Sequence, residues 1–372
     1  MVKIYFSVTN DLSSDQRVHR VISSLVKTGA SVCLVGRKLP DSLPLEQREY
    51  GTHRMSLLFK KGFLFYAFFN FRLFLFLMFR GKIDFLVSND LDTLPANYLV
   101  SKIRRVQLIY DSHEYFTEVP ELIGRKRVKK FWLKIEQMIL PHIKYAYTVS
   151  KPIADIYKSK YGVDFQLIHN FPLRNKESVN IELPFDKGND KVLIYQGAIN
   201  IGRGLETLIE VVGEMEKVRL IIAGDGDIRK SLEKYAKEKF PEKIYFTGKI
   251  QFSALHNLTK LADAGVSLEE DLGLNYRYAM PNKLFDYTQA EIPVLVSDLP
   301  EMKRIVEKYN IGIIVESRDK ATIHEAIGML LFNDDKRAEW KSGLKKAATE
   351  LCWENEEGKL LDIFFAAGLT IS

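Results

Sequence analysis

The sequence predicts an α/β protein with two parallel-sheet domains, and three observations lead to this prediction. The chain has 372 residues, which is longer than one ordinary domain. Short apolar runs alternate with helical stretches in two separate series, a pattern typical of parallel sheets with right-handed crossovers. A polar stretch without periodicity, residues 172–190, lies between the two series and has the composition of a linker.

The first domain is predicted to cover residues 1–171 and to begin with a strand at 3–8 and a helix at about 15–28. Its later strands are short apolar runs between polar loops, at 31–36, 85–88, 107–110, 145–149 and 166–169. Continuous apolar runs of this kind are typical of strands that are buried on both faces of a parallel sheet.

The second domain is predicted to cover residues 191–352, with a helix near 205–213. Its strands are the apolar runs at 191–196, 218–223, 244–247, 264–268, 293–297 and 312–315. Residues 353–372 are predicted to form a helix that packs back on the first domain. Two Rossmann-like domains of this kind are expected to face a cleft, in which ligands bind at the carboxyl ends of the strands.

The composition favours a cytoplasmic protein. The net charge of +6 is mild, and we expect no nucleic-acid partner. The two cysteines, Cys33 and Cys352, lie far apart and fit free thiols in a reducing compartment. The first residues lead directly into a strand and lack the layout of a signal peptide.

Residues 63–79 form an unusually aromatic segment, for which a helix is predicted. The default interpretation is a mostly buried helix of the first domain. The alternative is a helix in the membrane interface, where residues 57–82 and the basic cluster 125–130 contact anionic head groups. A spanning helix is disfavoured because Asn70 and Arg72 lie near the middle of the segment.

The stretch 279–298 predicts a loop, a short helix, a tight turn and a buried strand. Asn282 is a good N-cap, and Pro281 prevents the helix from extending backwards. Free backbone N–H groups and the helix dipole make such a start suitable for phosphate. Asp286, one turn further, could accept hydrogen bonds from ribose hydroxyls. An ordinary capped helix with an early acidic residue remains the alternative.

Other loops at predicted strand ends carry polar groups. The loop 196–204 contains Gly197, which permits close backbone approach, and Arg203, which suits a diphosphate; a turn with a solvated arginine is equally compatible. The loop after the first strand contains no glycine, which argues against a dinucleotide-binding dehydrogenase. His113 follows another strand and could hydrogen-bond a sugar hydroxyl, although a lone histidine is more often structural.

Acidic residues at two strand ends give further candidates. Asp90 and Asp92 have the spacing of a metal-chelating pair, but nothing else resembles a divalent site, so no metal is expected. The run 269–271 offers carboxylates to the same expected cleft or is a solvated acidic loop.

These motifs together resemble the GT-B glycosyltransferases, and most closely the retaining, nucleotide-sugar-dependent family 4. The resemblance covers nearly the whole chain. It is carried by the Gln196-Gly197 loop with Arg203, by residues 149–152, 168–172, 223–226, 246–250 and 281–287, and by Pro293-Val294.

The resemblance implies a donor site in the second domain. Arg203 matches the basic residue on the donor diphosphate, and Asp286 matches the second glutamate of the family's paired-glutamate motif. Asn282, Lys283 and Leu284 match the helix start over the phosphates. Lys249 and Ile250 match the segment that grips the nucleobase.

In the first domain, His113 resembles a histidine facing the transferred sugar. The loop with Asn10, Asp15 and Arg17 lies where acceptor and diphosphate meet in the family.

Three positions depart from the family pattern. Ala198 stands where the family has an arginine in the diphosphate loop, and the ribose acid is an aspartate. Tyr278 stands where the first glutamate of the pair is expected, and either Glu269 or Glu270, further upstream, is its possible replacement.

The resemblance implies a hexosyltransferase of surface polysaccharide biosynthesis. It would move a sugar, with retention, from a UDP- or GDP-linked donor to a glycan or a polyprenyl-diphosphate-linked acceptor. His113, Arg203 and Lys283 are the expected catalytic residues, without a cofactor. Two alternatives remain: a nucleotide-sugar epimerase of the same fold and a non-catalytic partner subunit. Membrane contact, if any, is expected to be peripheral and on the inner face of the plasma membrane.

Overall fold

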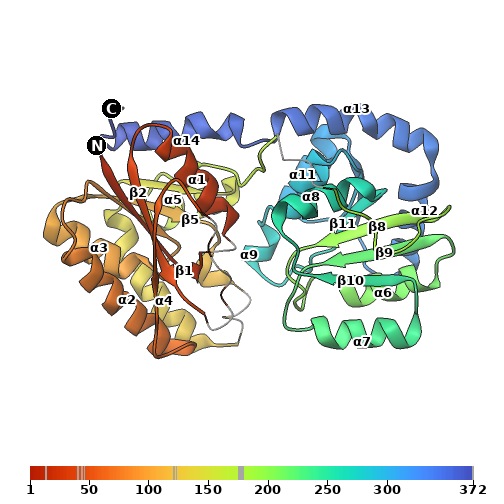
Figure 1. The fold of residues 1–372 in the computed structure, drawn as a ribbon, viewed down its shortest axis with the longest axis horizontal. Coiled ribbons are helices and arrows are strands. Elements are labelled where there is room, and N and C mark those ends of the chain that lie inside the picture. Colours follow the sequence, from red (N-terminus) through yellow and green to blue (C-terminus); the bar gives the residue numbers. More distant parts are fainter. Residues whose placement is uncertain are drawn as a thin grey trace. The chain divides into compact units, whose positions relative to one another are not determined.

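The computed structural model of the chain describes residues 1–12, 15–39, 42, 45, 47–119, 122, 124–174 and 180–370. It divides into two compact units (Figure 1). The first unit comprises Met1–Asn170 and Glu356–Ser372, and the second comprises Phe171–Asn355. Each unit is built on a parallel sheet covered by helices, which confirms the predicted α/β fold class.

The first unit contains a seven-stranded parallel sheet with the order β3-β2-β1-β4-β5-β6-β7. Its strands are β1 (Lys3–Asp11), β2 (Ser31–Arg37), β3 (Gly51–Met55), β4 (Phe85–Asn89), β5 (Gln107–Ser112), β6 (Tyr145–Thr148) and β7 (Gln166–Leu167). The strand order reverses between β1 and β4, so the loops after these two strands leave the sheet in opposite directions. Such a switch point is where open α/β sheets bind ligands.

One strand of this sheet, β3, has no counterpart in the sequence prediction. It pairs with β2 at the edge of the sheet, and its residues from Gly51 to Arg54 are exposed or half-buried. A polar edge strand lacks the apolar run that marks buried strands. Its existence therefore depends on pairing with β2 rather than on its own composition.

Six helices longer than one turn belong wholly or mainly to the described part of the first unit: α1 (Gln16–Val26), α2 (Gly62–Met78), α3 (Leu94–Arg104), α4 (Lys126–Ile139), α5 (Lys151–Tyr161) and α14 (Glu354–Ala366). Helices α2, α3 and α4 lie side by side (Figure 1). The terminal helix α14 belongs mainly to this unit. Its Phe364 is fully buried with its ring centroid 6.3 Å from that of Phe85, and the Tyr145 hydroxyl donates to the Ala366 carbonyl at 2.8 Å.

Helix α2 is the predicted aromatic helix, and it is apolar on both its buried and its exposed sides. Phe65, Phe69, Leu73 and Leu77, spaced by four residues, form its buried stripe. The amide of Asn70 is satisfied within the protein, because its Nδ2 donates to the Asp92 carbonyl at 2.7 Å and its Oδ1 accepts from the Ala96 N–H at 3.1 Å. Within the described residues, no helix combines the length and the apolar character needed to cross a membrane.

The second unit contains a six-stranded parallel sheet with the order β10-β9-β8-β11-β12-β13. Its strands are β8 (Lys191–Gln196), β9 (Val218–Ala223), β10 (Ile244–Gly248), β11 (Ala264–Ser267), β12 (Val294–Ser297) and β13 (Gly312–Val315). The strand order again reverses, here between β8 and β11. The loops after β8 and β11 therefore border the switch point of this sheet.

The helices of the second unit are α6 (Leu205–Glu214), α7 (Arg229–Lys239), α8 (Phe252–Leu261), α9 (Leu274–Arg277), α10 (Asn282–Gln289), α11 (Pro300–Tyr309), α12 (Lys320–Phe332) and α13 (Asp334–Glu350). Helices α6 and α7 lie on one side of the sheet, and α8 and α11 lie on the other (Figure 1). All predicted strands of this unit are present, and β8, β9 and β13 have the predicted bounds.

The described part of the predicted linker belongs to the second unit. Phe171 is buried with its ring centroid 4.7 Å from that of Phe285, and the ring of Phe185 lies 4.3 Å from that of Tyr245. The guanidinium of Arg219 also lies over the Phe185 ring, 4.8 Å from its centroid. Isolated aromatic anchors of this kind leave no periodicity in the sequence, which is why residues 180–190 resemble a free linker.

Candidate functional site

The centre of the candidate site in the second unit is Glu269, which follows β11 at the switch point. Its side chain is only 2% exposed. Its carboxylate accepts hydrogen bonds from the Lys283 ammonium at 2.6 Å, the Ser267 hydroxyl at 2.6 Å and the Arg203 guanidinium at 3.4 Å. Burial alone would raise the pKa of Glu269, but the charges of Lys283 and Arg203 and the hydrogen bonds lower it below its ordinary value. Glu269 is therefore ionised near neutrality.

The two cations of this cluster come from different elements. Arg203 lies in the loop between β8 and α6, and its guanidinium is 4.8 Å from the ring centroid of Tyr276. Lys283 is the second residue of α10, and its ammonium is 4.2 Å from the ring centroid of Tyr195. Two cations share one carboxylate, so the cluster keeps an excess positive charge beside the start of a helix. This arrangement favours a phosphate-bearing ligand.

Gly197, directly after β8, allows the backbone to pass close to Lys283. Its φ of +133° lies in the region that favours glycine, and a Cβ at this position would lie 3.4 Å from the Lys283 Cε. Gly224, after β9, packs against it: a Cβ there would lie 1.9 Å from the Gly197 carbonyl oxygen. Two glycines therefore let the loops after β8 and β9 meet at the carboxyl edge of the sheet.

Asp286 lies one turn after Lys283 in α10, and Gln196, the last residue of β8, holds its carboxylate. The Gln196 amide donates to Asp286 Oδ2 at 2.9 Å and accepts from the Thr259 hydroxyl at 2.7 Å. Asp286 is 9% exposed and is the fifth residue of α10, so no acid lies in the first turn of this helix. The chain Thr259–Gln196–Asp286 holds the carboxylate in one orientation.

One detail of the predicted helix start is wrong. Pro281 occupies the cap position, and Asn282 is the first residue of the helix rather than its N-cap. The Leu284 side chain is fully buried in the hydrophobic core, and the predicted place of this residue at the donor site stays a prediction. The core needs an apolar residue here because α10 packs on the sheet through this face.

Lys249 and Ile250 lie in the loop after β10. The ammonium of Lys249 is 81% exposed and 3.8 Å from the Asp225 carboxylate, and Ile250 packs at the margin of the core. The structure thus brings Gly197, Arg203 and Lys283 together around Glu269, with Lys249 and Ile250 in a separate loop. Glu270 points elsewhere: it is part-exposed and pairs with Arg318 at 3.3 Å.

Sequence reasoning missed Gln196, Ser267 and Tyr276 as parts of this site. Gln196 is a polar residue at the end of an apolar strand and is 3% exposed, which is a usable signal for a functional role. Ser267 and Tyr276 give no such signal, because they contribute only through contacts with Glu269 and Arg203.

The first unit carries a second polar cluster, built on Asp111 at the end of β5. Arg17 of α1 donates to both oxygens of Asp111, at 2.9 and 3.4 Å, and to the Ile168 carbonyl at 3.1 Å. Burial raises the pKa of Asp111, but the charges of Arg17 and His113 and their hydrogen bonds lower it to about 2. Arg17 is 4% exposed and joins α1 to the sheet through this ion pair; its predicted place on the acceptor side stays a prediction.

His113, which follows β5, has carboxylates at both ring nitrogens. Its Nε2 is 2.9 Å from Asp111 Oδ2, and its Nδ1 is 3.3 Å from Asp90 Oδ2. Burial alone would lower the pKa of His113, but the charges of Asp111 and Asp90 raise it well above its ordinary value. The ring thus lies between two carboxylates, and its Nε2 forms the hydrogen bond with Asp111. His113 also lines the pocket described below, and a contact between its ring and a sugar hydroxyl stays a prediction.

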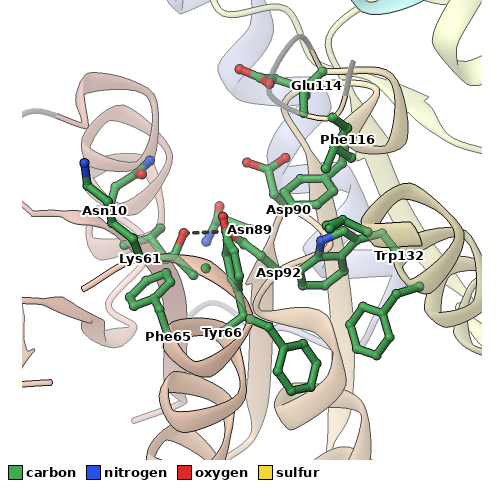
Figure 2. A pocket seen from close by; sticks show the side chains of 18 of the residues that line it. Asn10, Lys61, Phe65, Tyr66, Asn89, Asp90, Asp92, Glu114, Phe116 and Trp132 are labelled. Carbon is green, nitrogen blue, oxygen red and sulfur yellow. Dashed lines mark hydrogen bonds between the residues drawn. The ribbon is translucent and has the colours of Figure 1, made fainter. Parts of the chain in front are cut away.

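A pocket of about 660 Å³ opens beside this cluster (Figure 2). Asn10, Asp15, Asp90, Asp92 and His113 are among its polar lining residues. Asp15 also caps α1, because its carboxylate accepts from the Val18 N–H at 3.1 Å. The predicted acceptor-side residues Asn10 and Asp15 thus share one pocket.

Asp92 is the unusual acid of this pocket. It is 6% exposed, and its carboxylate accepts a hydrogen bond from the Thr9 hydroxyl. Burial, followed by the charge of Asp90, raises the pKa of Asp92 to about 7. The Asp90 carboxylate instead accepts from the backbone N–H of His113 at 2.8 Å, and Asp90 has a left-handed φ of +59°. The described residues contain no group of three or more His, Cys, Asp and Glu side chains arranged to hold a metal ion.

Comparison with known protein families gives two matches. The family described as Glycosyl transferases group 1 matches residues 180–347, and the family described as Glycosyltransferase Family 4 matches residues 15–171. The two matched regions fall in the second and the first unit, respectively. No sequence match to a curated protein reached significance.

Solved structures with the same fold cover nearly the whole chain. The sucrose-phosphate synthase of Thermosynechococcus elongatus has a TM-score of 0.76 at 16% identity, over 99% of this chain and 100% of that chain. HepE of Anabaena, in complex with UDP-glucose, has a TM-score of 0.72 at 13% identity, over 98% and 100%. WaaG, described as a glycosyltransferase involved in lipopolysaccharide biosynthesis, has a TM-score of 0.65 at 13% identity, over 98% and 99%. At these identities the likeness is one of fold.

Proposed function

The chain is a GT-B glycosyltransferase that resembles family 4, and on this premise we propose that it transfers a hexose from a nucleotide-diphosphate sugar to an acceptor hydroxyl. The observation that carries the proposal is the cluster of Arg203, Lys283 and Glu269 at the start of α10. Two cations from separate elements converge there on the switch point of the second-unit sheet, with Gly197 leaving room for a close approach. A diphosphate matches this charge and this shape.

The donor proposal assigns a role to each group of this site. The cations of Arg203 and Lys283 stabilise the leaving diphosphate, together with the N–H groups at the start of α10. Asp286, oriented by Gln196, accepts hydrogen bonds from the ribose. Lys249 and Ile250 contact the base. HepE was solved with UDP-glucose, which supports UDP as the first nucleotide to test, with GDP as the second.

The proposed transfer proceeds with retention and without a cofactor. The acceptor oxygen attacks C1 of the sugar on the face from which the nucleotide leaves, and forms the new C1–O bond. The bond between C1 and the β-phosphate oxygen breaks, and the nucleoside diphosphate takes the electron pair. The proton of the acceptor hydroxyl passes to that departing phosphate oxygen. No dedicated protein base is then required, and Arg203 and Lys283 lie where the leaving charge develops.

The proposed acceptor is a glycan or a lipid-linked sugar in surface polysaccharide biosynthesis. WaaG, which has this fold, is described as acting in lipopolysaccharide biosynthesis, and this supports the proposal. The proposed location is the cytoplasmic face of the membrane. Apolar side chains of 57–82 that are at least half exposed support peripheral contact there: Leu58, Phe63, Leu64, Phe71 and Phe79. The basic residues of 125–130 would contact anionic head groups.

The donor proposal is tested by measuring sugar transfer and by NMR of the product. Arg203→Ala and Asp286→Ala are each expected to lower kcat/KM more than about tenfold, the effect of losing one charge-assisted contact in the transition state. Arg219→Ala is the matched control, since this arginine of the same unit pairs with Asp190 at 2.6 Å outside the site. Near-normal activity of both site variants would refute the site. A product with inverted anomeric configuration would refute retention.

Membrane contact is tested separately by co-sedimentation with vesicles of anionic phospholipid. Phe79→Ser removes an aromatic side chain that is 84% exposed and should reduce binding, whereas vesicles of neutral lipid should bind less protein than anionic ones. Equal sedimentation of wild type and Phe79→Ser with both lipids would argue against the surface.

A further inference from the structure

We propose that the pocket of the first unit binds the acceptor as a lipid diphosphate, with the apolar chain on an aromatic wall, the diphosphate on a basic rim and the sugar at a polar floor. This inference rests on the proposed transferase function and deepens it, because it commits to a lipid-linked acceptor over a free glycan. The pocket is the one of about 660 Å³ shown in Figure 2. Its volume lies within the range of about 300–1,000 Å³ found for sites of small organic ligands.

The aromatic wall is continuous across three elements. Tyr66 of α2 and Phe116, in the short helix after β5, each pack edge to face on Trp132 of α4, with ring centroids 5.2 and 5.1 Å apart. Phe131 extends the wall from Trp132 towards Phe63, at 5.5 and 5.4 Å. Figure 2 shows Tyr66, Phe116 and Trp132 around the same space.

This wall suits an apolar chain better than a sugar. In edge-to-face pairs one ring covers the face of the other, whereas a sugar needs an open ring face to stack on. Phe63 and Phe131 remain 64% and 42% exposed, so the wall continues to the surface of the unit. Covering this exposed apolar area with a lipid chain removes it from water and so favours binding.

The basic rim provides the complement for a phosphate group. Arg37, Lys60, Lys61, Arg125 and Arg127 all line the pocket, and none of the five forms an ion pair within the described part of the chain. The Nε of Arg37 is buried and has no hydrogen-bond partner among the described residues. Its guanidinium lies 4.8 Å from the ring centroid of Phe65, at the border between rim and wall. An anionic group next to an apolar chain would pair with the cations of this rim.

The polar floor lies at the other side of the pocket. Figure 2 shows the carboxylates of Asp90 and Glu114 on the side opposite to the rings of Phe65 and Tyr66. The Asp90 carboxylate accepts a hydrogen bond from the backbone N–H of His113, and the Asp92 carboxylate accepts one from the Thr9 hydroxyl. Fixed carboxylate and amide groups, including Asn10, are suited to hydrogen-bond the hydroxyls of a sugar. The pocket therefore presents the three chemistries of a glycosylated lipid diphosphate in one cavity.

The test is isothermal titration calorimetry with three probes: farnesyl diphosphate, inorganic pyrophosphate and farnesol. The titrations contain saturating UDP, so that the site of the second unit is occupied. Farnesyl diphosphate should bind at least about tenfold more tightly than pyrophosphate, the effect of burying roughly two methylene groups. It should also bind more tightly than farnesol. Equal affinity for farnesyl diphosphate and pyrophosphate would overturn the proposal.

Matched variants on α4 assign the binding to the pocket. Phe131→Ser should weaken farnesyl diphosphate binding at least about fivefold without affecting pyrophosphate, since only the chain contacts this ring. Met138→Ser, two turns further along the same helix and 61% exposed, is its control. Arg37→Ala should weaken both anionic probes, and Lys134→Ala on α4 should weaken neither. Equal effects of Phe131→Ser and Met138→Ser would overturn the proposal.

Failure of this inference and failure of the transferase proposal give different results. UDP binding and sugar transfer to a free glycan, without a preference for farnesyl diphosphate, would refute the lipid acceptor and leave the transferase intact. Selective binding of farnesyl diphosphate without UDP binding would refute the donor site and leave the pocket assignment intact.

Discussion

The carboxylate of Glu269 accepts a hydrogen bond from the Lys283 ammonium at 2.6 Å, with both side chains almost completely buried at 2% and 7% exposure. The two residues are 14 positions apart in the chain and belong to different elements. Their pairing brings the loop after β11 to the start of α10. Because Arg203 shares the same carboxylate, this pair organises the positive charge of the candidate donor site.

The Lys283–Glu269 pair should show strong coupling in a double-mutant cycle. Lys283→Met leaves a buried carboxylate with fewer partners and should lower the free energy of unfolding by about 3 kcal/mol. Adding Glu269→Gln should recover part of this loss, with a coupling energy of about 1–3 kcal/mol measured by urea unfolding. The exposed pair Lys336–Glu339, at 2.9 Å, is the control and should couple by less than about 1 kcal/mol. Similar coupling in both pairs would contradict the assigned role.

Gly197→Ala should damage both stability and donor binding. Its φ of +133° is strained for alanine, and the new Cβ would lie 3.4 Å from Lys283 Cε, so the cost should be about 1–3 kcal/mol in the free energy of unfolding. UDP affinity should fall because relief of the strained φ shifts the loop that borders Lys283. Gly328→Ala, in helix α12 with open space around its Cβ position, should be neutral or stabilising by up to about 1 kcal/mol. The prediction fails if the two variants behave alike.

Asp111→Asn should destabilise the first unit and change the titration of His113. The variant leaves the buried guanidinium of Arg17 without its carboxylate, which should cost about 3–5 kcal/mol in urea unfolding. The pKa of His113, followed by NMR of the imidazole, should fall because its nearest carboxylate is gone. Asp164→Asn, at an exposed pair with Lys158, should change stability by less than about 0.5 kcal/mol. An unchanged His113 titration would refute the proposed cause.

Asp92 should make the protein less stable as pH rises towards neutrality. The pKa of Asp92 is raised from its ordinary 3.8 to about 7, so between these values the folded protein holds a proton that the unfolded chain has lost. Unfolding stability therefore falls as pH rises through this window. Asp92→Asn should flatten the slope, measured by thermal unfolding from pH 4 to 7, whereas Asp155→Asn at an exposed ion pair should not. Parallel slopes of wild type and Asp92→Asn would contradict the assignment.

Much of the architecture was predictable because its signals are local. Strands β8, β9 and β13 have their predicted bounds, since a run of apolar residues between polar loops is enough to identify a doubly buried strand. The aromatic helix α2 was recognisable because its apolar run is local too, and it is longer than an ordinary strand. Strand β3 and the packed residues 180–190 were not, because pairing with β2 and single aromatic anchors leave no pattern along the chain.

The sequence by itself determined the fold class, most of the strands along the chain and the loops in which the polar groups of the second unit lie. Only the tertiary structure decided what several of those groups contact. Glu269, and not Glu270, pairs with Lys283 in the basic cluster. Arg17 and His113 both pair with Asp111. The physical reason is that the charge state and the freedom of a side chain depend on its partners. Several of those partners come from helices and loops that are separated in the chain and meet only at the edge of the folded sheet.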